Sequence, residues 1–134
     1  MKSILTKIAA VLAFIIGAMA VFAGAQVLLG NDPGYYVINW VPVYNYTAGI
    51  LTVFITAILI WRGSKFAWLV AITTFSLHTL VMIILQTVHR DVVAVDSIRA
   101  MTIRMIAWAI ILVLMFAQSQ KDKKAQRLTT VAKS

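Results

Sequence analysis

Four long apolar stretches, separated by short polar connections, dominate this chain. They cover residues 8–29, 43–61, 66–86 and 98–117. A helix of about 20 residues crosses the hydrocarbon core of a bilayer, and each stretch is close to that length or longer. Because 62% of the residues are hydrophobic and only 12% are charged, little chain remains for a separate soluble domain. The sequence therefore predicts an all-α, polytopic membrane protein, a four-transmembrane-helix bundle over residues 1–117 with an aromatic outer loop.

Basic residues are distributed unevenly between the two ends of the predicted bundle. Nine of the twelve lie near the termini or between the second and third stretches, and only Arg90, Arg99 and Arg104 belong to the other side. Since cytoplasmic segments carry the excess of Lys and Arg, both termini are expected in the cytoplasm. This distribution accounts for the net charge of +8 without nucleic acid as a partner. Residues 118–134 are interpreted as a disordered basic cytoplasmic tail close to anionic lipid.

The first stretch has two further features. Ala23-Gly24-Ala25 fits a signal-peptide cleavage site, but the uncharged run of 22 residues is longer than a usual signal core and favours a retained helix. Five small residues follow one another at spacings of 3, 4, 3 and 4, which places them on one helical face: Ala10, Ala13, Gly17, Ala20 and Gly24. Such faces let helix backbones approach closely in lipid. We expect a helix-packing surface, either within the chain or in a homo-oligomer.

Arg104 is the residue most difficult to reconcile with a lipid environment. The apolar run that follows it, residues 105–117, amounts to about 20 Å of helix, whereas the bilayer core is about 30 Å thick. The spanning helix must therefore extend back through Arg104, about 9 Å below the boundary if it begins at Ile98. A charge at that depth costs several kcal/mol unless it is paired or hydrated, and it marks a candidate binding site. Arg99 is close enough to Asp96 for a local ion pair.

Polar residues from the other stretches are predicted to reach the same layer. At 1.5 Å per residue, His78 lies about 12 Å below the outer boundary and Thr52 about 14 Å below it. Asn45 shares a helical face with Thr52, and Trp40 belongs to an aromatic-rich connection that forms either an interfacial belt or a lid. The predicted ligand-binding residues are Arg104, His78, Arg99, Thr52, Asn45, Trp40 and Trp108.

The types of residue present argue against several chemistries. The chain has no Cys and no Glu, and all four Asp lie outside the apolar stretches, which argues against the small drug/proton exchangers that need a membrane-buried acid. His78 and His89 are separated by about 16 Å along a helix and cannot ligate one metal or haem together. No metal and no catalytic residue is predicted, so the chain is more consistent with a non-enzymatic protein. No cofactor is predicted, and haem and quinone are the alternatives that stay open.

A resemblance to a known group rests on the segment before the last apolar run. Asp96-Ser97-Ile98-Arg99-Ala100-Met101-Thr102-Ile103-Arg104, followed by Trp108, resembles the acidic-x-x-Arg, Ala-Met-Thr, Arg, Trp pattern of small uncharacterised bacterial four-helix inner-membrane proteins. The overall plan is similar to that of DoxX-like proteins, although the resemblance is close only over residues 96–108. It implies a four-helix bundle in the bacterial inner membrane and carries no activity.

Two classes of function follow from these observations. The first is a binding or accessory protein that presents an outer-leaflet polar pocket to an anionic membrane lipid, a quinone or a partner subunit of a larger membrane complex. The second is a redox or transport component in which His78 transfers protons or ligates haem.

Overall fold

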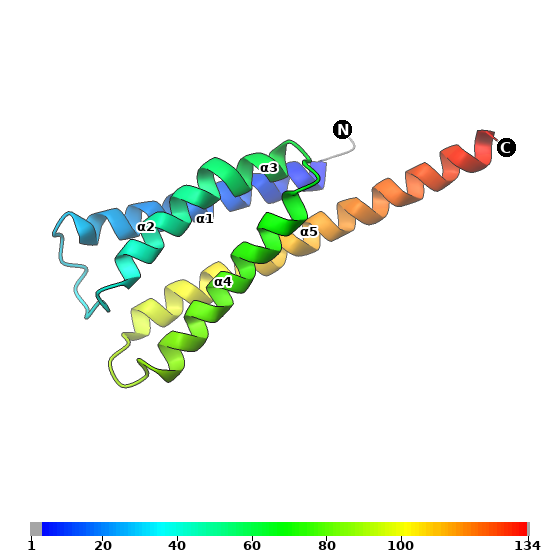
Figure 1. The fold of residues 1–134 in the computed structure, drawn as a ribbon. Helices are drawn as coiled ribbons and strands as arrows, with labels where there is room; N and C mark the ends of the chain where they lie inside the picture. Colours follow the sequence, from blue (N-terminus) through cyan, green and yellow to red (C-terminus); the bar gives the residue numbers. More distant parts are fainter. Residues whose placement is uncertain (1–3, 134) are drawn as a thin grey trace.

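The computed structural model describes residues 4–133, and all of its regular elements are helical. They are α1 (Ile4–Leu28), α2 (Val41–Leu51), the π-helical segment η1 (Thr52–Thr56), α3 (Ala57–Trp61), α4 (Ala67–Thr87) and α5 (Val95–Lys133). α2, η1 and α3 follow one another without a break as a single rod (Figure 1). With that rod counted once, four helices of the described region are long and apolar enough to cross a membrane. The predicted all-α, four-helix membrane fold is confirmed.

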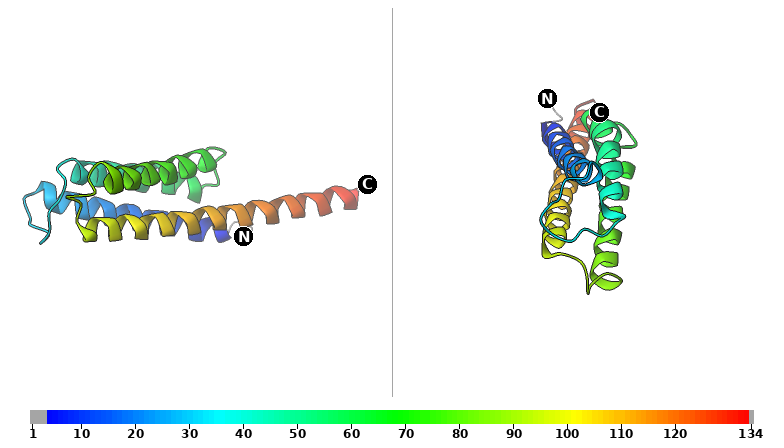
Figure 2. Two further views of the ribbon diagram at one scale, coloured as in Figure 1. Left: turned by 90° about the horizontal axis from the view of Figure 1, so that it is seen from below. Right: turned by 90° about the vertical axis from the view of Figure 1, so that its left-hand side faces the viewer.

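Successive rods of the bundle run in opposite directions (Figure 1). The connections of residues 29–40 and 88–94 therefore lie at one end, which we call the aromatic end because the first connection contains Tyr35, Tyr36 and Trp40. The other end holds the beginning of α1 and the turn of residues 62–66, and we call it the basic end. α5 continues well beyond the basic end (Figure 2).

The extension of α5 differs from the prediction of a disordered tail after residue 117. The helix continues to Lys133, since the segment after Asp96 has no Gly or Pro to end it and contains many good helix formers. The other predicted boundaries differ from the observed ones by at most four residues. Lys2, which contributed to the predicted orientation, lies outside the described residues.

α1 approaches α2 closely enough for their backbones to touch. A Cβ atom added to Gly24 would lie 2.6 Å from the carbonyl oxygen of Pro42. A Cβ atom added to Gly49 would lie 2.7 Å from the carbonyl oxygen of Gly17. No residue larger than Gly fits these contacts without a shift of the backbone. The predicted small face of α1 is thus used inside the chain, and all five of its residues are buried.

Buried side chains form two clusters along the bundle. The cluster nearer the basic end is built around Trp108, Ile111 and Ile60, which are fully buried, together with alanines of α1 and α4. The cluster at the aromatic end joins Leu85 and Met101 to the beginning of α2. Large apolar side chains are exposed along every rod, as expected for a surface that faces lipid.

The connection between α1 and α2 consists of turns whose residue types suit the backbone conformations they adopt. Gly30 adopts a φ of +94° after the end of α1, a conformation that favours glycine. Asp32 Oδ1 accepts a hydrogen bond of 2.8 Å from the N–H of Gly34, whose φ is +85°. Pro42 then occupies the first turn of α2, where its missing N–H is not needed. These turns bring residues 35–37 over the aromatic end.

Candidate functional site

Arg104 lies on the face of α5 that points into the bundle. The buried residues of α5 recur at spacings of 3, 4, 3, 4 and 3: Met101, Arg104, Trp108, Ile111, Met115 and Gln118. That period keeps one side of a helix against its neighbours. The burial of Arg104 therefore follows from its place in this pattern, and only 7% of its surface is exposed.

The guanidinium of Arg104 is held by neutral groups. Its Nη1 donates hydrogen bonds to Asn45 Oδ1 on α2 and, at 3.7 Å, to Met101 Sδ one turn earlier on α5. Among the described residues, no carboxylate lies within ion-pair distance of it. A guanidinium has five N–H donors, so Nε and Nη2 remain without a protein partner in this part of the chain.

Arg104 lines a cavity of about 50 Å³ at the aromatic end. All four rods and residues 35–37 contribute to its wall, and its other polar side chains are Tyr35, Asn45 and Ser97. This volume is sufficient for a few water molecules or one phosphate or carboxylate group. It is far below the roughly 300 Å³ at which pockets for drug-sized ligands begin.

His78 and Trp108 form a second polar group beside this cavity. His78 on α4 is buried, and its Nδ1 forms a hydrogen bond with the hydroxyl of Tyr44. The rings of His78 and Trp108 have centroids 6.5 Å apart. Trp108 is fully buried, and its Nε1 has no hydrogen-bond partner within the described residues. Since Tyr44 and Asn45 are consecutive, α2 holds both His78 of α4 and Arg104 of α5.

Trp40 takes a different position from the predicted one. Its Nε1 donates a hydrogen bond of 3.4 Å to His89 Nε2 just beyond the end of α4, and its ring lies edge-on to that of Tyr44 with centroids 6.4 Å apart. Trp40 is not among the residues that line the cavity. The residues of this connection that do line it are Tyr35 and Val37, so the predicted pocket position of Trp40 is corrected.

Two further predicted residues lie away from the cavity. The side chain of Arg99 is 68% exposed and pairs with Asp96 at 3.4 Å. The hydroxyl of Thr52 donates to the carbonyl oxygen of Ala48 at 2.7 Å. Predicted depth along a helix was not enough to place these groups, because depth does not specify which way a helix is rotated. Of the seven predicted residues, only Arg104 and Asn45 line the cavity.

Tyr44 is a site residue that the sequence did not single out. It shares a helical face with Ala48 and Thr52, since the three residues recur at a spacing of four. That spacing placed Tyr44 on the bundle side of α2 and was the available signal for it. The identity of its partner, 34 residues away in the sequence, required the tertiary structure.

No group of three or more His or Asp side chains in the described region is arranged to hold a metal ion. Comparison with known proteins adds no family to this geometry, because no family model, curated protein or solved structure matches the chain. The function therefore has to be inferred from the contacts of Arg104 and its neighbours.

Proposed function

We propose that this multi-pass membrane protein binds the phosphate of an anionic lipid headgroup against Arg104, in the cavity at the aromatic end. We place it in the bacterial inner membrane with both termini in the cytoplasm, so that the cavity belongs to the outer leaflet. The support for this orientation is the charge of the basic end, where Lys7, Arg62, Lys65 and the extension of α5 carry most of the cations.

The observation on which the proposal rests is a buried arginine without a counter-ion. Inside a membrane such a charge is strongly disfavoured, and Asn45 and Met101 supply only neutral acceptors. The unused N–H donors of a guanidinium match two oxygens of a phosphate or carboxylate in bidentate geometry. An anionic group in the cavity would therefore satisfy both the charge and the donors of Arg104.

The volume of the cavity discriminates among the predicted ligands. About 50 Å³ accommodates a single phosphate or carboxylate but not the ring of a quinone. Both a lipid headgroup and the acidic side chain of a partner subunit have this chemistry. We favour the lipid because the cavity lies toward the aromatic end of four helices long and apolar enough to cross a membrane, and its wall includes Tyr35 and Val37 of the connection at that end, within reach of a headgroup.

The resemblance to DoxX-like proteins is part of this proposal, and it rests on residues 96–108. It supports the inner-membrane location and the position of Arg104 near the start of the last spanning helix. A homo-oligomer remains compatible with the lipid-exposed surface of the bundle, but the small face of α1 is occupied within the chain.

The proposal is tested by measuring what copurifies with the protein in mild detergent. We expect Arg104→Leu to lose one phospholipid per chain, with occupancy reduced roughly tenfold, equivalent to about 1.4 kcal/mol. Arg104→Lys should retain part of the bound phospholipid, since lysine keeps the positive charge but lacks the paired N–H donors of a guanidinium. Arg99→Leu is the matched control, because it removes an exposed arginine from the same helix.

Quantitative mass spectrometry of lipids and proteins distinguishes the outcomes. Retention of the same phospholipid by Arg104→Leu contradicts the proposal. Loss of a copurifying protein without loss of lipid would also contradict it, and would identify a partner carboxylate as the ligand instead.

A second candidate function is proton transfer through His78. It is favoured by the hydrogen bond between Tyr44 and His78, which lies in a series of ring contacts that continues through Trp40 to His89 at the aromatic end. Proton flux in proteoliposomes that falls in both Tyr44→Phe and His78→Gln would support it. A visible absorption spectrum of the purified protein tests haem ligation by the same residue.

A further inference from the structure

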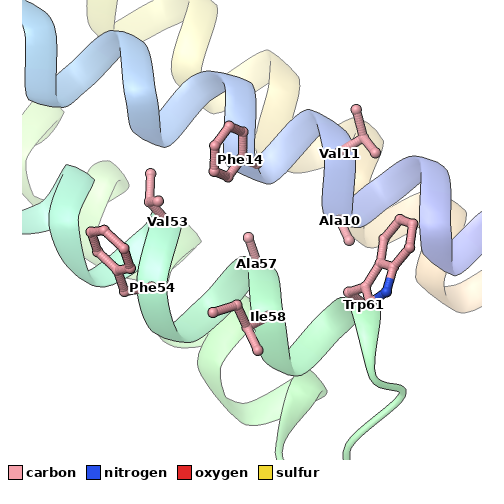
Figure 3. A pocket seen from close by; sticks show the side chains of 8 residues that line it. All are labelled: Ala10, Val11, Phe14, Val53, Phe54, Ala57, Ile58 and Trp61. Atoms are coloured by element: carbon pink, nitrogen blue, oxygen red, sulfur yellow. The ribbon is translucent and has the colours of Figure 1, made fainter.

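An apolar groove runs along the bundle between α1 and the rod of η1 and α3. Its volume is about 320 Å³, and it is lined by residues 10, 11 and 14 of α1 and residues 53, 54, 57, 58 and 61 of the rod. Ala10 and Ala57 leave room between the two helices, and the larger side chains of Phe14, Phe54 and Trp61 stand around that room (Figure 3). The groove shares no residue with the cavity at Arg104.

The length of the groove matches one leaflet of a membrane. On the rod it extends from Val53 to Trp61, a rise of about 12 Å. Half of the hydrocarbon core of a bilayer is about 15 Å thick. Because Trp61 is the last residue of α3 at the basic end, the groove begins at the membrane boundary on that side and ends near the centre of the bilayer.

The ammonium group of Lys7 lies at the end of the groove that is nearest the membrane boundary. Lys7 Nζ lies 4.0 Å from the centroid of the Trp61 ring and donates a hydrogen bond of 3.2 Å to the Trp61 carbonyl oxygen. A lysine ammonium has three N–H donors, so two remain for a group at the headgroup level. Arg62 and Lys65 are exposed in the turn that follows. The groove is thus apolar along its length and positively charged at its mouth.

We propose that this groove binds one acyl chain of an anionic phospholipid whose headgroup contacts Lys7. A helix from a second copy of the chain is a poorer occupant, because a helix is about 10 Å wide and only the side chains of one of its faces could enter between α1 and the rod. An acyl chain is thin enough to enter the groove, and the positive mouth selects a negatively charged headgroup.

The test is native mass spectrometry of the delipidated protein with added phosphatidylglycerol or phosphatidylcholine. The double variant Val11→Trp/Ile58→Trp fills the groove from two of its exposed lining positions. In the Arg104→Leu background, which leaves only the groove site, we expect it to bind either lipid roughly tenfold more weakly than Arg104→Leu alone does. The matched control, Val113→Trp/Ile106→Trp, places the same bulk at exposed positions outside the groove and should bind as Arg104→Leu alone does.

A second variant tests the charge separately from the groove. Lys7→Gln should still bind phospholipid, but the ratio of its affinities for phosphatidylglycerol and phosphatidylcholine should fall about fivefold. Lys124→Gln, on the exposed extension of α5, is the control and should keep the full preference. Arg104→Leu should lose the lipid at the aromatic end but keep the headgroup preference of the lipid in the groove, which separates the two sites.

Three outcomes would overturn the proposal. One is binding of phosphatidylglycerol by the groove-filled double variant as strong as that of its control. Another is an unchanged headgroup preference in Lys7→Gln. The third is a dimer of the wild type that is lost in the groove-filled variant alone, which would identify a second copy of the chain as the occupant.

Discussion

Arg104 occupies a position at which its neighbours on the same face of α5 are apolar or uncharged. A leucine there would continue the buried face without burying a charge. A buried ion without a counter-ion is destabilising relative to a hydrophobic residue of similar volume. The hydrogen bond to Asn45 lowers that cost, and the stability of the two residues should therefore be coupled.

A double-mutant cycle measures this coupling. We expect Asn45→Leu alone to reduce the free energy of unfolding by about 1 to 2 kcal/mol, because Arg104 loses an acceptor. In the Arg104→Leu background the same change should have almost no effect. Unfolding in detergent, followed by loss of helical circular dichroism, provides the measurement. An equal effect in both backgrounds would show that the two residues are not coupled.

The hydrogen bond between Tyr44 and His78 gives a second prediction at this scale. Tyr44→Phe removes the hydroxyl and keeps the ring, so it should reduce stability by roughly 0.6 to 1.7 kcal/mol, as for other polar contacts between membrane helices. Tyr46→Phe is the control, since Tyr46 is exposed on the same helix. Equal thermal unfolding temperatures for the two variants in detergent would contradict the prediction.

At the scale of single elements, the rod of α2, η1 and α3 has an unusual buried face. From Ala48 onward its buried residues form two rows at a spacing of four: 48, 52, 56 and 60, and 49, 53 and 57. In a regular α-helix a row of this kind turns away by about 40° at each step. The wider turn of η1, in which the N–H of Ala57 bonds to the carbonyl oxygen of Thr52, compensates for this rotation. The rod therefore stays against α1 along its length.

The glycines between α1 and α2 should differ in their tolerance of a methyl group. Gly24→Ala and Gly49→Ala each place Cβ within 2.7 Å of backbone atoms, so we expect a loss of about 1 to 3 kcal/mol. Gly17→Ala first meets the side chain of Thr52, at 2.9 Å, and should cost less because its contacts are longer and are with side chains rather than with backbone. Thermal unfolding of the three purified variants in one detergent tests this order. The prediction is wrong if Gly17→Ala is the most destabilised of the three.

At the scale of the whole molecule, α5 is much longer than the membrane is thick. Its 39 residues extend over about 58 Å, whereas the hydrocarbon core occupies about 30 Å. The remainder projects from the basic end and carries Lys121, Lys123, Lys124, Arg127 and Lys133. If the basic end is cytoplasmic, this helix is an exposed cationic surface on that side.

Cysteine labelling tests this orientation directly, because the chain has no cysteine of its own. Asn31→Cys in the aromatic connection should react with a membrane-impermeant maleimide in intact cells. Ala132→Cys near the end of α5 should react only after the membrane is permeabilised. Both positions are exposed, so accessibility of the thiol does not limit the result. The reverse labelling pattern would place the cavity at Arg104 in the inner leaflet.

Local composition was sufficient to predict the number of spans, the helical fold and the position of Arg104 inside the last span. A helix crosses a membrane because of its own length and polarity, and a repeated spacing of three and four residues specifies which face it buries. The pair of Arg99 with Asp96 is also local, since the two residues are one turn apart. The helical extension of α5 was local too, but its high charge led to a prediction of disorder.

The tertiary structure alone decided which polar residues meet. Arg104 and Asn45 are 59 residues apart in the sequence, and Trp40 and His89 are 49 apart. The depth of each residue followed from the rise of the helix, but the rotation and approach of each helix depend on contacts with its neighbours. For this reason Thr52 does not line the cavity despite its predicted depth, whereas Tyr44 forms a hydrogen bond with the buried His78. The groove beside Ala57 likewise exists only because two separate helices leave space between them.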